Sequence, residues 1–226
     1  MIVRFLMTRD WKKFWGDQSD PRHPSTVPDF FRNHGSELAL VVGDPAGKRV
    51  LEIGCGSGSL FKAIGFDRAE FYRGVDFSEK MLAVFRAAEP AVDTVCADAS
   101  SYCDSGKYDL IFSNAVAQYF DRSMLRHHIA NARAMLAPRG RLIVGSVPWR
   151  GARMAFHLQA YSAAADRRLF RGMAVLARSY LGVDQIGHWY SYREFSKTAG
   201  KHGLIATFFG CIQYPYRFHV RLDKPS

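Results

Sequence analysis

The chain has 226 residues, 48% of them hydrophobic, which suits one large globular domain with a substantial core. It contains no run of 18 apolar residues, so we expect no membrane span, and the apolar start at residues 1–7 is too short for a secretory signal. None of the four cysteines lies in a Cys-x-x-Cys pair, which indicates reduced thiols and a cytoplasmic location.

The formal net charge of +10 is distributed unevenly along the chain. Residues 1–113 carry 14 Lys and Arg against 16 Asp and Glu, whereas residues 114–226 carry 17 against 5. The basic half is compatible with an anionic partner, such as nucleic acid, a membrane surface or a phosphorylated small molecule. It is equally compatible with a plain solvated surface.

The first half alternates between strand and helix patterns. Residues 8–24 hold two tryptophans and read as an ordered arm, and a helix follows at 28–43. Strands are expected at 48–53, 70–75, 92–97 and 108–113. Helices are expected near 58–64 and at 79–88, the second capped by Ser78. This alternation predicts an α/β fold with a parallel sheet.

The second half begins with a helix at 122–136, ended by Pro138 and Gly140, and a strand at 141–147. His127 and His128 lie on this helix and are expected to face solvent. After a long, arginine-rich helical stretch, Ser191 and Glu194 fit a capping box at the start of a helix that ends at Gly203. Strands at 204–210 and 213–221, joined by a bend at 210–211, complete the sheet.

Residues 50–58, Val-Leu-Glu-Ile-Gly-Cys-Gly-Ser-Gly, carry the strongest functional signal. An apolar strand runs into Gly54, Gly56 and Gly58, which allow a tight turn and close approach of a ligand to the backbone. Asp76 ends the next strand, 22 residues after Gly54. An acid roughly 20 residues after the first glycine binds a ribose diol in βαβ units, so we predict an adenosine-type cofactor.

A dinucleotide-binding turn needs glycine or alanine at position 59, which is serine here. The pattern Gly-x-Gly-x-Gly, preceded by Glu52, instead resembles the class I (Rossmann-like) S-adenosylmethionine-dependent methyltransferases. The likeness covers roughly residues 48–147 in the family's order. It continues through the segments Gly74-Val75-Asp76-Phe77-Ser78, Cys96-Ala97-Asp98-Ala99, 108–114 and 136–144.

The resemblance implies a doubly wound, seven-stranded, mostly parallel sheet with a C-terminal antiparallel hairpin and a helical lid insertion. We expect a single methyltransferase domain over 1–226. Its parts are an N-terminal arm and helix (1–43), a cofactor-binding core (44–147), the helical lid insertion (148–190), and the last helix with the C-terminal strands (191–226). In the family such insertions cover the methyl-transfer pocket. A helical subdomain that mediates homodimerisation is the alternative for 148–190.

The resemblance also implies a cofactor site for S-adenosylmethionine, with S-adenosylhomocysteine as product. The glycine turn would contact the methionine part of the cofactor, and Asp76 would bind the ribose. Phe77 and Met81 would pack on the adenine face, and the loop after the third strand would bind the adenine edge. Glu52 and the Ser113 carbonyl are candidates to support the turn or the ammonium group. The full set is Glu52, Gly54, Cys55, Gly56, Gly58, Asp76, Phe77, Met81, Asp98, Ala99 and Ser113.

Methyl transfer is an in-line displacement, so alignment and exclusion of water are the main tasks. A hydroxyl acceptor also benefits from a general base, for which His188 is our first candidate and His157 the second. The side chains expected to orient the acceptor or line the lid are Asn114, Gln118, Tyr119, Tyr161 and Tyr190.

Other features of the sequence narrow the range of possible acceptors. The Ser113–Val116 segment lacks the proline and aromatic residue typical of enzymes that methylate planar amino groups. Only Asp121 lies near as a carboxylate beyond the fourth strand, so we expect no metal. The segment Tyr214–Val220 resembles methyltransferases of bacterial surface-sugar and secondary-metabolite pathways, and the arginines of the second half suit an anionic group. This resemblance implies O-methylation of a small anionic acceptor, a sugar or a secondary metabolite. The alternatives are an RNA methyltransferase that uses the basic half, and a non-catalytic cofactor-binding protein.

Overall fold

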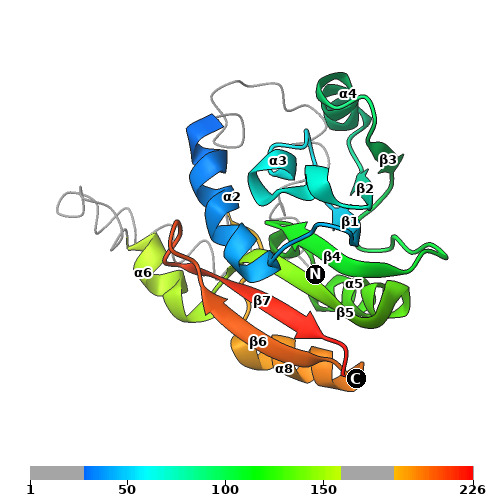
Figure 1. Cartoon of the computed structure of the whole chain (residues 1–226). Helices are drawn as coiled ribbons and strands as arrows, with labels where there is room; N and C mark the ends of the chain where they lie inside the picture. The colour runs from blue at the N-terminus through cyan, green and yellow to red at the C-terminus, as the bar shows by residue number, and fades with distance from the viewer. Residues whose placement is uncertain (1–27, 159–185, 226) are drawn as a thin grey trace, which may run out of the picture.

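The computed structural model describes residues 28–158 and 186–225. The expected arm at 8–24 and most of the expected lid, including Tyr161, lie outside these ranges. The described part is built on a seven-stranded sheet of order β3-β2-β1-β4-β5-β7-β6 (Figure 1). The strands are β1 (Arg49–Ile53), β2 (Phe71–Asp76), β3 (Asp93–Cys96), β4 (Tyr108–Asn114), β5 (Leu136–Pro148), β6 (Ile205–Gly210) and β7 (Arg217–Asp223).

Strands β1 to β5 pair in parallel, whereas β7 runs antiparallel to both β5 and β6. The predicted fold class, with its antiparallel C-terminal hairpin, is confirmed. The carboxyl ends of the parallel strands meet at one edge of the sheet, and β7 begins at the same edge because Pro148 pairs with Arg217. We call this edge the carboxyl edge.

Helices cover both faces of the sheet (Figure 1). One face packs against α2 (Pro28–Val42), α3 (Phe61–Ile64) and α4 (Glu79–Ala88), and the other against α5 (Arg122–Met135) and α8 (Tyr192–Lys201). Alternate strand residues explain the division: Val50 and Leu110 belong to the first core, Leu51 and Ile111 to the second. Such strands are apolar on both faces because both are buried.

The remaining described elements are short. They are η3 (Phe66–Arg68), η4 (Ala117–Tyr119), η5 (Arg150–Ala152) and α6 (Arg153–His157). Two predicted helix starts are confirmed in atomic detail. The Ser78 hydroxyl accepts a hydrogen bond from the amide of Met81, and Ser191 forms a reciprocal capping box with Glu194.

Three boundaries differ from prediction. Pro138 and Gly140 do not end the helix, because α5 stops at Met135 and β5 already begins at Leu136. The pairing of β5 with β4 jumps from Leu136 to Arg141, so residues 137–140 form a bulge within the strand. The bend between the last strands is longer than two residues: residues 211–216 connect β6 to β7. The helix expected from 58 begins only at Phe61.

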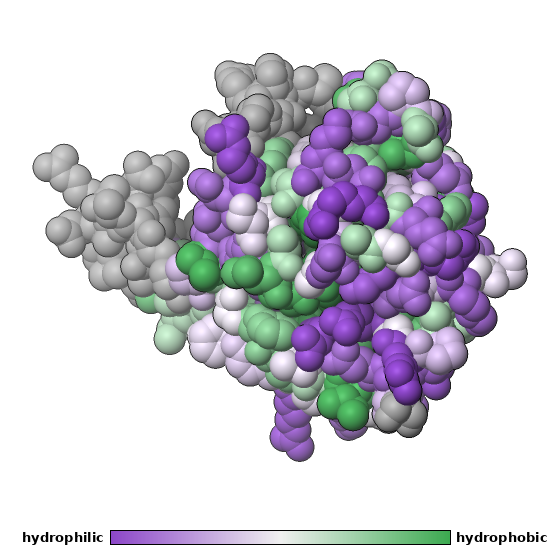
Figure 2. Space-filling model, viewed as in Figure 1, coloured by the Kyte–Doolittle hydropathy of each residue, from purple (hydrophilic) through white to green (hydrophobic). Residues whose placement is uncertain are grey.

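The face seen in Figure 2 is mostly hydrophilic, with apolar side chains scattered over it. Exposed examples are Leu40 and Ile212. Scattered apolar side chains are normal on a protein surface. None of the helices in the described ranges is both long and apolar enough to cross a bilayer.

Candidate active site

The glycine turn joins β1 to α3 at the carboxyl edge. The amides of Gly54 and Cys55 both donate to the carbonyl of Val75, at 2.6 and 3.1 Å, which fastens the turn to the neighbouring strand β2. Gly54, Gly56 and Gly58 all have positive φ, a region that other residues rarely adopt. The backbone conformation of the turn therefore requires its glycines.

The three glycines differ in what surrounds them. A Cβ on Gly54 would lie 2.3 Å from Val116 Cγ2, and one on Gly58 would lie 2.2 Å from the Phe85 ring. A Cβ on Gly56 would meet only the Met81 methyl, at 3.7 Å. Gly54 and Gly58 thus make room for the protein's own core. Gly56 is the position at which the backbone stays accessible to a ligand.

Asp76 ends β2 beside this turn. Its Oδ2 accepts from the Gly56 amide at 3.0 Å and its Oδ1 from the Ser78 amide at 2.9 Å. Burial raises the pKa of Asp76, and these amides partly offset that effect. The side chain stays partly exposed, and a carboxylate has about four acceptor positions. Asp76 can therefore support the turn and still accept from a ligand.

Glu52 lies below the turn and is buried. Its Oε2 accepts from the Tyr72 hydroxyl at 2.6 Å. Burial raises the pKa of Glu52 to about 8, with the nearby Asp76 charge adding to the effect. Burial therefore favours the protonated carboxyl of Glu52, whose described hydrogen-bond partner is Tyr72 in the core. Its neighbour Cys55 is also buried, and burial raises the thiol pKa well above its ordinary value.

The loop after β3 carries the two residues expected to bind adenine. Asp98 Oδ1 accepts from the amide and the hydroxyl of Ser100, at 2.9 and 2.6 Å, which shapes the loop. Phe77 and Met81, the other adenine candidates, lie at the same edge and are partly exposed. All of these residues lie where the carboxyl ends of β2 and β3 meet.

The expectation that His128 faces solvent is wrong, because its side chain is only 1% exposed; His127 is exposed as expected. His128 Nδ1 lies 3.1 Å from the Ala99 carbonyl, and Nε2 lies 3.2 Å from Ser113 Oγ. Since a carbonyl only accepts, Nδ1 carries the proton and Nε2 accepts from the serine. Burial lowers the pKa of His128 to about 4, so the ring is neutral.

His128 therefore connects α5 to the end of β4 and to the loop after β3. The sequence does contain a signal for its burial. Leu125, Ile129 and Ala132 are apolar and, with position 128, form one stripe at helical spacing. Ser113 is fully buried in this network.

Beyond β4, the carboxyl edge holds buried polar atoms without a hydrogen-bond partner among the described residues. They are Asn114 Oδ1 at the end of β4, Gln118 Oε1 in η4, and Arg217 Nε at the start of β7. Buried polar groups normally have partners, so such atoms call for a water or a ligand. Asn114 and Gln118 were expected to contact the acceptor; Arg217 was not anticipated from the sequence.

The described end of the expected lid, 186–190, docks on η4. The His188 amide donates to the Gln118 carbonyl at 2.8 Å, and a Cβ on Gly187 would lie 2.3 Å from that oxygen. The His188 side chain is exposed, close enough to Asp121 for the two to interact electrostatically. Tyr190 is buried and its hydroxyl donates to the Phe120 carbonyl, so acceptor binding by that hydroxyl has no support.

The second candidate base, His157, is buried at the end of α6. Its ring packs at 5.2 Å from Phe156 and 5.8 Å from Trp189. Tyr119, another acceptor candidate, lies in η4 and is partly buried. The geometry therefore favours His188 over His157 as a side chain that a ligand can reach.

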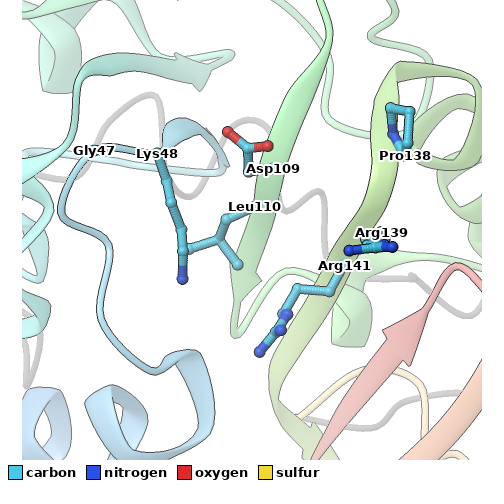
Figure 3. A pocket seen from close by; sticks show the side chains of 7 residues that line it. All are labelled: Gly47, Lys48, Asp109, Leu110, Pro138, Arg139 and Arg141. Atoms are coloured by element: carbon cyan, nitrogen blue, oxygen red, sulfur yellow. The ribbon is translucent and has the colours of Figure 1, made fainter. Parts of the chain in front are cut away.

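A pocket opens at the opposite edge of the sheet, where β1 and β5 begin (Figure 3). Lys48, Arg139 and Arg141 line it together with Asp109, whose Oδ2 accepts from the Arg49 amide at 2.9 Å. In Figure 3 the Lys48 and Arg141 side chains extend in the same direction, away from the Asp109 carboxylate. This basic pocket lies at the far edge from Asp76 and the glycine turn.

Comparisons with known proteins point to the same part of the chain. Residues 50–140 match the family model of a methyltransferase domain. The chain is 36% identical over 112 residues to a trans-aconitate 2-methyltransferase from Acidovorax, covering 48% of this chain and 42% of that one. It is 37% identical over 120 residues to a probable non-canonical nonribosomal peptide synthetase, CymA, from Salinispora arenicola. That match covers 49% of this chain and 2% of the synthetase. The chain thus spans less than half the length of these curated relatives.

Among solved structures, the N-methyltransferase NodS from Bradyrhizobium japonicum, in complex with S-adenosylhomocysteine, shares the fold. The TM-score is 0.63 at 18% identity, with 95% of this chain and 96% of that one covered. At this identity the similarity concerns the fold alone.

Proposed function

We propose that the chain is a class I S-adenosylmethionine-dependent methyltransferase that transfers a methyl group from S-adenosylmethionine to a small anionic acceptor, most simply on oxygen. The observation that carries this proposal is the pairing of Asp76 with Gly56. It combines a partly exposed carboxylate with an accessible backbone position at the carboxyl edge. Open α/β sheets bind ligands at that edge.

The residues present fit the cofactor. The Asp76 carboxylate has acceptor positions left for the two ribose hydroxyls, and Gly56 leaves space above the turn. Phe77 and Met81 are available to pack on the adenine, with Asp98 and Ala99 at its edge. When bound, the cofactor supplies an electrophilic methyl group on a sulfonium whose departure leaves a neutral thioether. The chain's own contribution is to bind, align and exclude water.

The acceptor is proposed to lie against the unpartnered atoms at the carboxyl edge. Asn114 and Gln118 offer buried acceptor oxygens, and Arg217 offers a buried donor with a positive charge. Such a set suits a molecule that carries both hydroxyl groups and an anionic group. The acceptor named for the Acidovorax relative, trans-aconitate, is a small carboxylic acid anion, which supports the anionic class.

The need for a base depends on the atom that is methylated. A hydroxyl has to lose a proton during transfer, whereas a carboxylate is already ionised at neutral pH. For a hydroxyl acceptor we propose His188 as the base, because it is exposed beside Gln118. The variant His188→Gln then distinguishes the two chemistries: turnover of a hydroxyl acceptor falls at least tenfold, and turnover of a carboxylate acceptor is unchanged.

RNA methylation, the second candidate, has weaker support. Lys48, Arg139 and Arg141 are a described basic group, but they line the pocket at the opposite edge. Phosphates held there would not bring a nucleotide to the glycine turn. An RNA substrate would show affinity that falls steeply with salt, which a small acceptor would not.

The proposal is tested by calorimetric titration of the full chain with S-adenosylmethionine, followed by detection of S-adenosylhomocysteine in the presence of acceptor panels. The panels contain small di- and tricarboxylates, phosphorylated sugars, neutral sugars and short RNAs. We expect cofactor binding and turnover with an anionic small molecule. Absence of cofactor binding contradicts the function, and turnover restricted to RNA contradicts the acceptor class.

A further inference from the structure

A buried cluster of histidine, glutamate and cysteine lies between α2 and the connection from β6 to β7. His34, Glu37 and Cys211 are 2%, 8% and 6% exposed, and one ligand atom from each lies within 4.8 Å of the others. Figure 1 shows α2 alongside the tip of the β6–β7 hairpin, which supplies Cys211. Two elements far apart in sequence therefore bring three metal-binding side chains together.

The distances between the donor atoms suit a metal ion with tetrahedral coordination. Donor atoms around zinc, at 2.0–2.3 Å from the metal, lie about 3.3–3.8 Å apart. His34 Nδ1 is 3.8 Å from Glu37 Oε2. His34 and Glu37 are three residues apart on one helix, so both side chains extend from the same face. Small side-chain rotations would bring Cys211 Sγ into the same range.

The surrounding hydrogen bonds orient the ligands as metal sites require. His34 Nε2 lies 2.9 Å from Ser146 Oγ, so donation by Nε2 to the serine would leave Nδ1 directed towards Glu37 and Cys211. Glu37 Oε1 accepts from His219 Nε2 at 3.1 Å and from the Ile212 amide. Oε2 accepts from the Gln213 amide at 3.2 Å, which leaves it one acceptor position.

We propose that His34, Glu37 and Cys211 form a binding site for zinc, with Ser146 and His219 orienting the ligands. Nitrogen, oxygen and sulfur donors together select zinc over magnesium or calcium, which prefer oxygen alone. Three protein ligands leave a fourth position for water or an exogenous ligand.

Binding exchanges a proton for the metal at Cys211. As the ion enters, the S–H bond breaks, the proton passes to solvent, and a Zn–S bond forms, so no oxidant or reductant is needed. The expectation that the protein uses no metal rested on carboxylates beyond β4. This site draws on other residue types from other elements.

The test uses the full, tag-free chain after chelation, with no cofactor present, so that its outcome is independent of the methyltransferase proposal. The chain is titrated with zinc, and the metal content of the dialysed protein is measured. Cobalt is then substituted, because a thiolate ligand gives cobalt a charge-transfer band in the near ultraviolet. We expect about one zinc per chain and a thiolate band with cobalt.

Matched variants assign the ligands. Cys211→Ser should remove the thiolate band and weaken zinc binding at least about 100-fold, and Ser146→Ala should weaken it about 10–100-fold. Cys96→Ser and Cys103→Ser, which change exposed cysteines, should leave both unchanged. If Cys211→Ser does not fold, X-ray absorption of the zinc-loaded wild-type chain shows whether a sulfur atom is bound to the metal. One sulfur at about 2.3 Å supports the site. No bound zinc, a shell of nitrogen and oxygen only, or a band that survives in Cys211→Ser overturns it.

Discussion

The two sides of the carboxyl edge are assembled over very different sequence distances. On the cofactor side, the contact between Gly56 and Asp76 spans 20 residues, within one βαβ unit. On the acceptor side, the Arg217 side chain donates to the Ser146 carbonyl across 71 residues, and the His188 amide donates to the Gln118 carbonyl from another distant segment. A local backbone motif builds the first side, whereas the second depends on the completed fold. The first is therefore encoded in a short pattern, and the second in scattered side chains.

The largest effect should come from the glycines of the cofactor side. Gly58→Ala combines a left-handed backbone with a Cβ that overlaps the Phe85 ring, so we expect the free energy of unfolding to fall by roughly 2–5 kcal/mol. The matched variant Gly56→Ala carries only the backbone cost, about 1–2 kcal/mol. It should instead weaken cofactor binding. Denaturant unfolding and calorimetry measure the two effects, and equal losses of stability would contradict the division between these glycines.

The second effect concerns the ribose. Asp76→Ala removes two charge-assisted hydrogen bonds and should weaken S-adenosylmethionine binding at least about tenfold. Asp109→Ala, which removes an acid at the opposite edge, is the control and should leave the affinity unchanged. Calorimetry on both variants compares them directly. Unchanged affinity in Asp76→Ala would mean that the ribose binds elsewhere.

A third prediction probes the acceptor side. Gln118→Leu removes a buried oxygen that lacks a partner among the described residues, so stability should be unchanged or rise by up to about 1 kcal/mol. The KM for the acceptor should rise about tenfold, because the ligand loses a partner. Thermal unfolding measures the stability of the variant, and initial rates measure its KM for the acceptor. Lower stability together with an unchanged KM would assign Gln118 to the fold rather than to the site.

The smallest effect in binding should come from His128, which links the two sides. His128→Gln should lower stability by roughly 1–3 kcal/mol, by leaving Ser113 and Ala99 without their partner, and weaken cofactor binding only a few-fold. The exposed His127→Gln should stay within about 0.5 kcal/mol of the wild type.

The His128 effect should also depend on pH. The folded-state pKa of about 4 lies below the unfolded value of about 6.5, so the unfolded chain binds more protons between these values. The free energy of unfolding of the wild type therefore decreases as pH falls from about 6.5 to about 4. The variant has no histidine at position 128, so its stability does not decrease for this reason. The stability gap between the two should therefore narrow by up to about 1.4 kcal/mol per pH unit. A constant gap would mean that folding does not lower the pKa of His128.

These contrasts also explain what the sequence could predict. The places of the strands along the chain, the Ser78 cap and the Ser191 capping box follow from patterns a few residues long, whereas the seven-stranded sheet with its antiparallel hairpin was implied by the family resemblance. The start of β5 was misjudged because Pro138 and Gly140, which usually end a helix, here form a bulge. His34 and Arg217 were not found, since each acquires its neighbours only when α2 and β7 meet the end of β5. A pattern of a few neighbouring residues cannot indicate contacts between elements so far apart in the sequence.

The most direct measurement is a crystal structure of the full chain with S-adenosylhomocysteine. The account predicts both ribose hydroxyls within hydrogen-bonding distance of the Asp76 carboxylate, backbone contact at Gly56, and the sulfur directed towards Asn114 and Gln118. A ligand found instead in the basic pocket of Lys48, Arg139 and Arg141, or a glycine turn left vacant at saturating ligand, would contradict it.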